Sequence, residues 1–247
     1  MTADATLKEP AQRAVNRLLA QRLPGADNKP LAWGDPKTGV FNTDLTNDSW
    51  MALRSAMRAC LVLGDGPDRV KIWWDSAWKA ANPGWEKLTD PDVALSTFPA
   101  SWSAKDGAQG DDVPAGACMA VFLGQHLGDI RLESLVNTLV DKNLPTGKTL
   151  PTDLKAFYLG CLAVYQHGGE PWRKWNPATR DSLVPQQRME NGCFDGSWDP
   201  QTQTYAGKER GRLQSTLYAK LTLGLFYIYK MDPVVKPEPV PPAAGTK

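Results

Sequence analysis

The sequence predicts an all-α fold built from repeated helical hairpins. Three of the four cysteines, Cys60, Cys118 and Cys161, each follow a small residue and precede an apolar one, and a glycine-bearing turn comes after each of them. A buried cysteine packs as a small hydrophobic residue where two helices approach closely. No alternation of polar and apolar residues is long enough to indicate a sheet. The recurrence indicates hairpin units of roughly 40 residues plus inserted loops.

A second observation is the turn Gly196-Ser197-Trp198, which precedes an apolar helical run that starts at Arg212. Glycine permits a tight turn, and an indole can cover a helix end while its N–H binds a carbonyl that the helix leaves unpaired. Trp198 is therefore expected to join the last hairpin to its neighbour. Taken alone, the same residues also fit a surface loop with a half-buried tryptophan.

The first half of the chain contains three helical patterns. Residues 10–23 are amphipathic, with small and apolar side chains on one stripe. The polar run 46–48 is expected to cap a helix that extends to residue 63. Pro67 begins its partner at 69–80, because proline fits the first turn of a helix.

The second half of the chain contains five more helical patterns. Pro114 and Pro151 mark two helix starts, and Asn176-Pro177 combines a capping residue with a proline at the first helical position. The expected helices cover residues 114–127, 130–142, 153–166, 177–188 and 212–230.

The more uniformly apolar helices are expected to form an inner layer, and the amphipathic helices an outer layer. The inner layer comprises residues 46–63, 114–127, 153–166 and 212–230, and the outer layer comprises 10–23, 69–80, 130–142 and 177–188. Together they form one repeat domain over residues 10–231. Residues 1–9 are expected to be an N-terminal tail, and the proline-rich residues 232–247 a flexible C-terminal tail.

Composition excludes several classes of protein. With 28 basic and 27 acidic residues and no long basic cluster, the charge gives no reason to expect nucleic-acid binding. No apolar run reaches membrane-spanning length, and the polar start of the chain lacks the regions of a signal peptide. The chain therefore reads as soluble, with no compartment indicated.

Tryptophan is abundant, with ten in the chain, and most of them lie in the first half. The indole-rich segments 33–50 and 73–102 are expected to provide a contact surface, because rim loops of repeat folds usually carry binding. The alternative is that these indoles are core and hairpin-junction residues. The candidate binding residues are Trp33, Trp50, Trp74, Trp85 and Trp102.

The pattern resembles the prenyltransferase and squalene-cyclase repeat superfamily, in particular the bacterial prenyltransferase/squalene-oxidase-repeat proteins that are not demonstrated cyclases. The resemblance is carried by residues 48–56, by Ala156-Phe157-Tyr158-Leu159-Gly160, by residues 167–177 and by residues 196–200. It extends over about residues 10–230. It implies helical hairpins arranged as an α/α toroid.

A complete toroid of this family has more helices than the eight expected here, and the chain opens on an outer helix. The resemblance therefore implies a partial or open toroid, or the C-terminal part of a longer protein. A cyclase needs an enclosed cavity to shield a carbocation from water. Such a cavity is not expected in an arc of this length.

The segment 109–115, Gln-Gly-Asp-Asp-Val-Pro-Ala, is similar to the Asp-x-Asp-Asp-Thr-Ala acid motif of class II terpenoid cyclases. The resemblance implies Asp111 as proton donor and Asp112 as its partner. Gln109 and Val113 replace two polar residues of the motif. The alternative is an acidic cap that precedes Pro114 at a helix N-terminus.

Metal chemistry has little support. No cysteine pair has the Cys-x-x-Cys spacing of a zinc site. The superfamily's prenyltransferases hold zinc with Asp, Cys and His, whereas here Cys193 and Asp195 stand near neither His126 nor His167. No metal and no cofactor are therefore expected. A carboxylate pair like those of toroidal polysaccharide lyases and glycosidases stays open, by analogy of fold alone.

These observations predict a non-catalytic repeat module used for binding or assembly, with a protein, glycan or lipid partner. The alternative is a class II terpenoid cyclase-like enzyme that protonates a polyprenyl substrate with Asp111.

Overall fold

The computed structural model describes residues 5–87, 96–103, 105–124, 129–145, 150–200 and 208–225, and this part of the chain is mostly helical. A π-helical turn, Leu139–Asn143, continues α5, and short 3-10 turns cover Ala5–Leu7, Trp85–Lys87 and Val184–Gln186. The helices are α1 (Lys8–Ala20), α2 (Thr43–Arg58), α3 (Gly66–Ala81), α4 (Val113–Phe122), α5 (Ile130–Thr138), α6 (Leu154–His167), α7 (Gly169–Leu183) and α8 (Lys208–Leu223).

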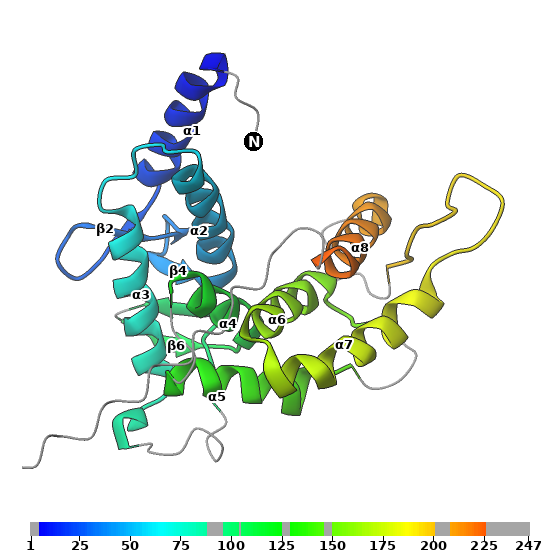
Figure 1. Ribbon diagram of the computed structural model, residues 1–247. Coiled ribbons are helices and arrows are strands. Elements are labelled where there is room, and N and C mark those ends of the chain that lie inside the picture. Colours follow the sequence, from blue (N-terminus) through cyan, green and yellow to red (C-terminus); the bar gives the residue numbers. More distant parts are fainter. Residues whose placement is uncertain are drawn as a thin grey trace, which may run out of the picture.

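The helices form two layers along a curve. The even-numbered helices pack on one another in chain order, α2 on α4, α4 on α6 and α6 on α8. Figure 1 shows α3, α5 and α7 following one another along the outside of this row. Most residues of α4 and α6 are buried, as expected for helices that are covered on several sides. The arrangement agrees with the expected inner and outer layers.

Asparagine and aspartate side chains start three of the inner helices. Asn42 caps α2 by accepting a hydrogen bond from the Leu45 N–H (2.7 Å), and Asp153 caps α6 by accepting one from Ala156 N–H (2.9 Å). Asp112 does the same for α4. The expected cap at residues 46–48 is therefore wrong, since α2 begins at Thr43. As a result, Asn47 and Asp48 lie inside the helix rather than at its end.

Two small antiparallel sheets correct the all-α prediction. One pairs β1 (Leu23–Pro24) with β2 (Pro30–Ala32). The other has four strands in chain order, β3 (Gly34–Asp35), β4 (Val40–Asn42), β5 (Ser101–Ser103) and β6 (Gly107–Gln109). Strands of two or three residues are too short to produce a visible alternation in sequence. The observed class is mainly helical with small sheets at the junctions.

Tryptophan side chains join successive hairpins at two equivalent places. The Trp198 Nε1–H donates to the Leu183 carbonyl at the end of α7 (2.8 Å), as expected for the Gly-Ser-Trp turn. The Trp33 Nε1–H donates in the same way to the Leu18 carbonyl near the end of α1 (2.9 Å). The backbone N–H of each indole residue also donates to a threonine of the next inner helix, Thr46 or Thr216.

Two of the three repeated cysteines are buried and one is not. Cys118 in α4 and Cys161 in α6 are fully buried, whereas Cys60 is exposed. The prediction for Cys60 is wrong because α2 ends at Arg58, and Cys60 adopts a left-handed backbone conformation (φ +56°) that takes it out of the helix. Cys193 is exposed as well, and all four thiols are free.

Further helix boundaries differ from the prediction. The start expected at Asn176-Pro177 is wrong, because α7 begins at Gly169 and carries Pro177 in its interior. Gly168, with φ +74°, makes the break between α6 and α7. The helical conformation also reaches back to Ala5, into the expected N-terminal tail. Residues 226–230, His126 and the C-terminal tail 232–247 lie outside the described residues.

Candidate functional site

The candidate tryptophans are mainly core residues. Trp33, Trp50 and Trp74 are only 3%, 4% and 0% exposed, so their indoles pack in the core and do not form the exposed rim that the sequence led us to expect. Trp33 closes the end of α1, and the Trp74 Nε1–H donates to the Gly116 carbonyl (3.0 Å). The physical reason is that a large indole stabilises most where neighbouring elements cover it.

The other two candidates are partly exposed. Trp102 stacks on Phe41 of the neighbouring strand, with ring centroids 5.5 Å apart. Trp85 lies edge-on to Trp78, with centroids 6.5 Å apart. Both rings therefore take part in aromatic packing while they stay partly exposed.

The two acidic motif residues lie in different environments. Asp111 is exposed, and its Oδ1 accepts a hydrogen bond from the Thr97 hydroxyl (2.7 Å). Asp112 is the N-cap of α4, where its Oδ1 accepts from the Ala115 N–H (3.2 Å). Burial raises the pKa of Asp112 to about 6, and the nearby carboxylates of Asp44 and Asp153 add to that rise.

The inner surface of the arc contains a hollow of about 480 Å³ between α2, α6 and α8. One face of α2 provides Asn47, Asp48, Met51 and Ser55, which recur at helical spacing. The opposite wall combines polar and aromatic groups, Lys155 and Tyr158 from α6 and Tyr218 from α8.

Two ion pairs join α6 to α2 at this hollow, one of them to Asp48 in its lining. Lys155 Nζ lies 2.6 Å from Asp44 Oδ1 and 2.7 Å from Asp48 Oδ2. Burial by itself lowers the pKa of Lys155, but its hydrogen bonds to the two carboxylates outweigh that effect and raise it. Burial raises the pKa of Asp48, and the bond to Lys155 opposes the rise. Lys155 therefore stays cationic and holds the two carboxylates against α6.

Asn47 is the least satisfied polar side chain of the hollow. It is 0% exposed, and neither its Oδ1 nor its Nδ2 has a hydrogen-bond partner within the part of the chain that the structure describes. A buried amide without partners costs free energy of folding, about 1–3 kcal/mol. An apolar residue at this position would avoid that cost, so Asn47 requires a reason other than packing.

Tyr158 and Tyr218 form the aromatic part of the wall. Their ring centroids are 5.9 Å apart and the planes are tilted by 39°. Burial raises the pKa of Tyr218. The two rings therefore give the hollow an apolar surface next to its charged and amide groups.

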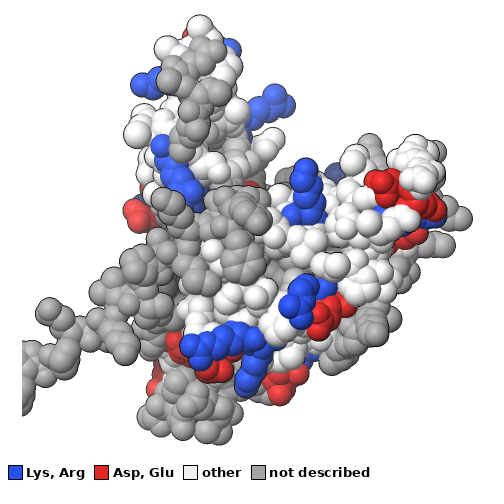
Figure 2. Space-filling model, turned by 45° about the vertical axis from the view of Figure 1, so that its right-hand side comes forward, with Lys and Arg blue, Asp and Glu red and all other residues white. Residues whose placement is uncertain are grey.

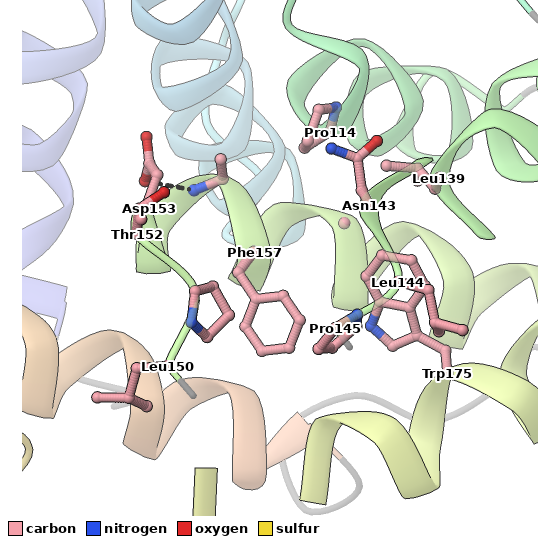
Figure 3. Close-up of a pocket in the computed structure, with 13 residues that line it drawn as sticks. Pro114, Leu139, Asn143, Leu144, Pro145, Leu150, Thr152, Asp153, Phe157 and Trp175 are labelled. Carbon is pink, nitrogen blue, oxygen red and sulfur yellow. Dashed lines mark hydrogen bonds between the residues drawn. The ribbon is translucent and has the colours of Figure 1, made fainter. Parts of the chain in front are cut away.

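A second hollow of about 340 Å³ lies where the N-terminal half of α6 meets α7 and the π-helical turn. Figure 3 shows Phe157 and Trp175 in its wall, and their rings stack with centroids 6.0 Å apart. Trp175 is buried and its Nε1–H donates to Cys161 Sγ (2.8 Å). Asp153, at the edge, is occupied in capping α6. This hollow is lined mostly by apolar side chains.

Neither the charged side chains on the face drawn in Figure 2 nor the possible metal ligands among the described residues gather into another site. Figure 2 shows basic and acidic side chains scattered in small groups over the face that it draws. Within residues 5–225, leaving out the gaps in the description, no group of three His, Cys, Asp or Glu side chains is arranged to hold a metal ion. Cys193 and Asp195 are exposed, and His167 Nε2 bonds to Glu133 (2.9 Å).

Comparison with known proteins gives no relative: no protein-family model, no curated protein and no solved structure matches the chain. Among the described helices, none combines the length and the apolar character that crossing a membrane requires.

Proposed function

We propose that this chain is a non-catalytic binding module, an open α/α toroid of the prenyltransferase/squalene-oxidase repeat type, that holds its ligand on the concave face between α2, α6 and α8. The resemblance in residues 156–160 and 196–200 supports the family. The observation that carries the function is Asn47, a fully buried amide without partners in the wall of a hollow. A ligand would supply those partners.

The inner face is a better contact surface than the tryptophan-rich segments. Indoles that pack in the core have no face left for a ligand, whereas Asp48, Ser55 and Tyr218 border an open volume. The pairing of Lys155 with Asp44 and Asp48 holds the polar groups in place before a ligand arrives. Such preorganisation lowers the entropic cost of binding.

Blocking the hollow should abolish binding. Ser55 is exposed at its edge, with its hydroxyl donating to the Met51 carbonyl (3.0 Å). Ser55→Tyr would occupy the volume without entering the core. The matched control is Ser76→Tyr on the outer helix α3, where the serine makes the same type of bond, to the Ile72 carbonyl (2.8 Å).

The measurement is calorimetry of wild type and both variants against a set of sugars, amino acids, dipeptides and nucleosides. We expect at least one compound that binds wild type and Ser76→Tyr, is recovered unchanged, and binds Ser55→Tyr at least tenfold more weakly. Equal binding to both variants, or no binding by any compound, would overturn the proposal.

An enzymatic alternative rests on Asp112. Its raised pKa, about 6, keeps part of the population protonated close to neutral pH, as a general acid requires. The cyclase-like reading assigns the proton to Asp111 instead, and Asp111 is exposed. Product analysis with a polyprenyl substrate tests both residues. A cyclised terpenoid made by wild type but not by Asp111→Asn or Asp112→Asn would replace the binding proposal by an enzyme.

A further inference from the structure

We infer that the ligand of the concave hollow is a short, uncharged saccharide, held through hydroxyl groups by Asn47, Asp48 and Lys155 and through a ring face by Tyr218. This inference rests on the proposed function and adds the chemical class of the ligand. It rests on the hydrogen-bond donors, acceptors and tyrosine rings that line the hollow, and on the missing hydrogen-bond partners of Asn47.

Asn47 defines the hydrogen bonding that the ligand must provide. Its Oδ1 needs a donor and its Nδ2 needs an acceptor, and both atoms are buried and unpaired within the described residues. A hydroxyl group both donates and accepts, so one hydroxyl, or two on adjacent carbons, satisfies the whole amide. A carboxylate or a phosphate ester only accepts, and it would leave Oδ1 without a donor.

The ion pairs define the charge of the ligand. Asp48 accepts hydrogen bonds and Lys155 donates them, and the two groups lie 2.7 Å apart at the edge of the same hollow. Because Lys155 is already paired with Asp44 and Asp48, an anion would have to displace carboxylates and a cation would have to displace an ammonium group. A neutral ligand with several hydroxyls binds both partners without breaking the pair.

The tyrosines define the shape of the ligand. Tyr158 and Tyr218 present ring surfaces beside these polar groups. A sugar ring has an apolar face of C–H groups and a rim of hydroxyls, which matches this juxtaposition. The volume of about 480 Å³ lies in the range of small-molecule sites, roughly 300–1,000 Å³.

An extended peptide is the competing ligand, because a peptide amide also donates and accepts. The saccharide is favoured because the adjacent Asp48 and Lys155 offer an acceptor and a donor side by side. Two neighbouring hydroxyls can donate to Asp48 and accept from Lys155. A single peptide unit that binds Asn47 leaves Asp48 and Lys155 without a hydrogen bond to the ligand.

The test uses calorimetry with di- and trisaccharides of glucose, galactose, mannose, xylose and N-acetylglucosamine, and with alanine and glycine dipeptides as the competing class. Asn47→Leu should lose saccharide affinity by at least tenfold, while its melting temperature stays equal to or above that of wild type, because an unpaired buried amide is removed. Asp48→Asn provides a second variant, matched by Asp65→Asn, which removes the ion pair between the exposed Asp65 and the largely buried Arg22 (3.1 Å), two residues that do not line the hollow.

Saccharide binding that is weakened by Asn47→Leu and Asp48→Asn but not by Asp65→Asn supports the inference. Saccharide binding that Asn47→Leu leaves intact, or no binding by any saccharide, overturns it. If a dipeptide or another compound binds and Ser55→Tyr blocks it, the saccharide is excluded while the proposed function stands. If no compound depends on Ser55, both fail.

Discussion

At the scale of single residues, the acidic cap Asp112 couples stability to pH. Its pKa rises from 3.8 to about 6 on folding, so the folded protein binds this proton more tightly than the unfolded chain does. The Asp112 contribution favours folding in acid and turns into a cost as the pH increases from about 4 to about 6, beyond which the cost is complete.

Asp112→Asn should remove that cost and keep the cap, because asparagine is an equally good N-cap. We expect equal stability of variant and wild type near pH 3.5, and a variant more stable by about 1–3 kcal/mol at pH 7. Urea unfolding at both pH values measures the difference. A variant that is less stable at pH 7 would mean that the charged form of Asp112 is favoured in the fold.

Thiol reactivity also belongs to the residue scale. Burial raises the pKa of Cys161 to about 12, and it raises the pKa of Cys118 as well. Since the thiolate is the reactive form, these two groups should react slowly. A thiol titration of native protein should find two fast groups, Cys60 and Cys193, and four after unfolding. Fast reaction of a third thiol in native protein would contradict the burial.

At the scale of elements, Trp33 and Trp198 fix the ends of α1 and α7. Each indole is buried and donates to a carbonyl of the helix that precedes it. Replacing either with Ala should cost about 3–5 kcal/mol of unfolding free energy, through lost packing and a lost hydrogen bond. Replacement with Phe should cost less, because much of the packing remains.

Trp102→Ala is the control, because that ring is only partly covered. Denaturant unfolding of the variants measures the differences. If Trp33→Ala or Trp198→Ala costs less than about 0.5 kcal/mol, as surface substitutions do, these indoles do not join the hairpins.

The elements also show which local signals are reliable. Pro114 and the apolar runs around Cys118 and Cys161 correctly predict α4 and α6. These signals are reliable because they depend only on residues that are close together in the sequence. The sheet was not predictable, since Phe41 pairs with Trp102, far away in the chain, through strands of three residues. Pro177 fails as a start signal because Gly168 already breaks the chain and α7 continues through the proline.

At the scale of the whole molecule, the row of inner helices brings together a site that the sequence does not indicate. Lys155 meets Asp48 across 107 residues, so no local motif contains both. Asn47 and Asp48 read as capping residues in sequence, and only the earlier cap at Asn42 frees them for the inner face. The sequence did contain one signal for this site, since polar residues recur on one face of a helix that we expected in the inner layer.

The concave hollow between α2, α6 and α8 is the proposed ligand site. Chemical-shift perturbation of ¹⁵N-labelled protein, titrated with the tightest-binding disaccharide, tests it most directly. We predict chemical-shift changes that cluster on the amides of Asn47, Asp48, Lys155 and Tyr218, and the loss of these changes in Ser55→Tyr. Shifts that cluster instead around Phe157 and Trp175, or around Trp85 and Trp102, would contradict it.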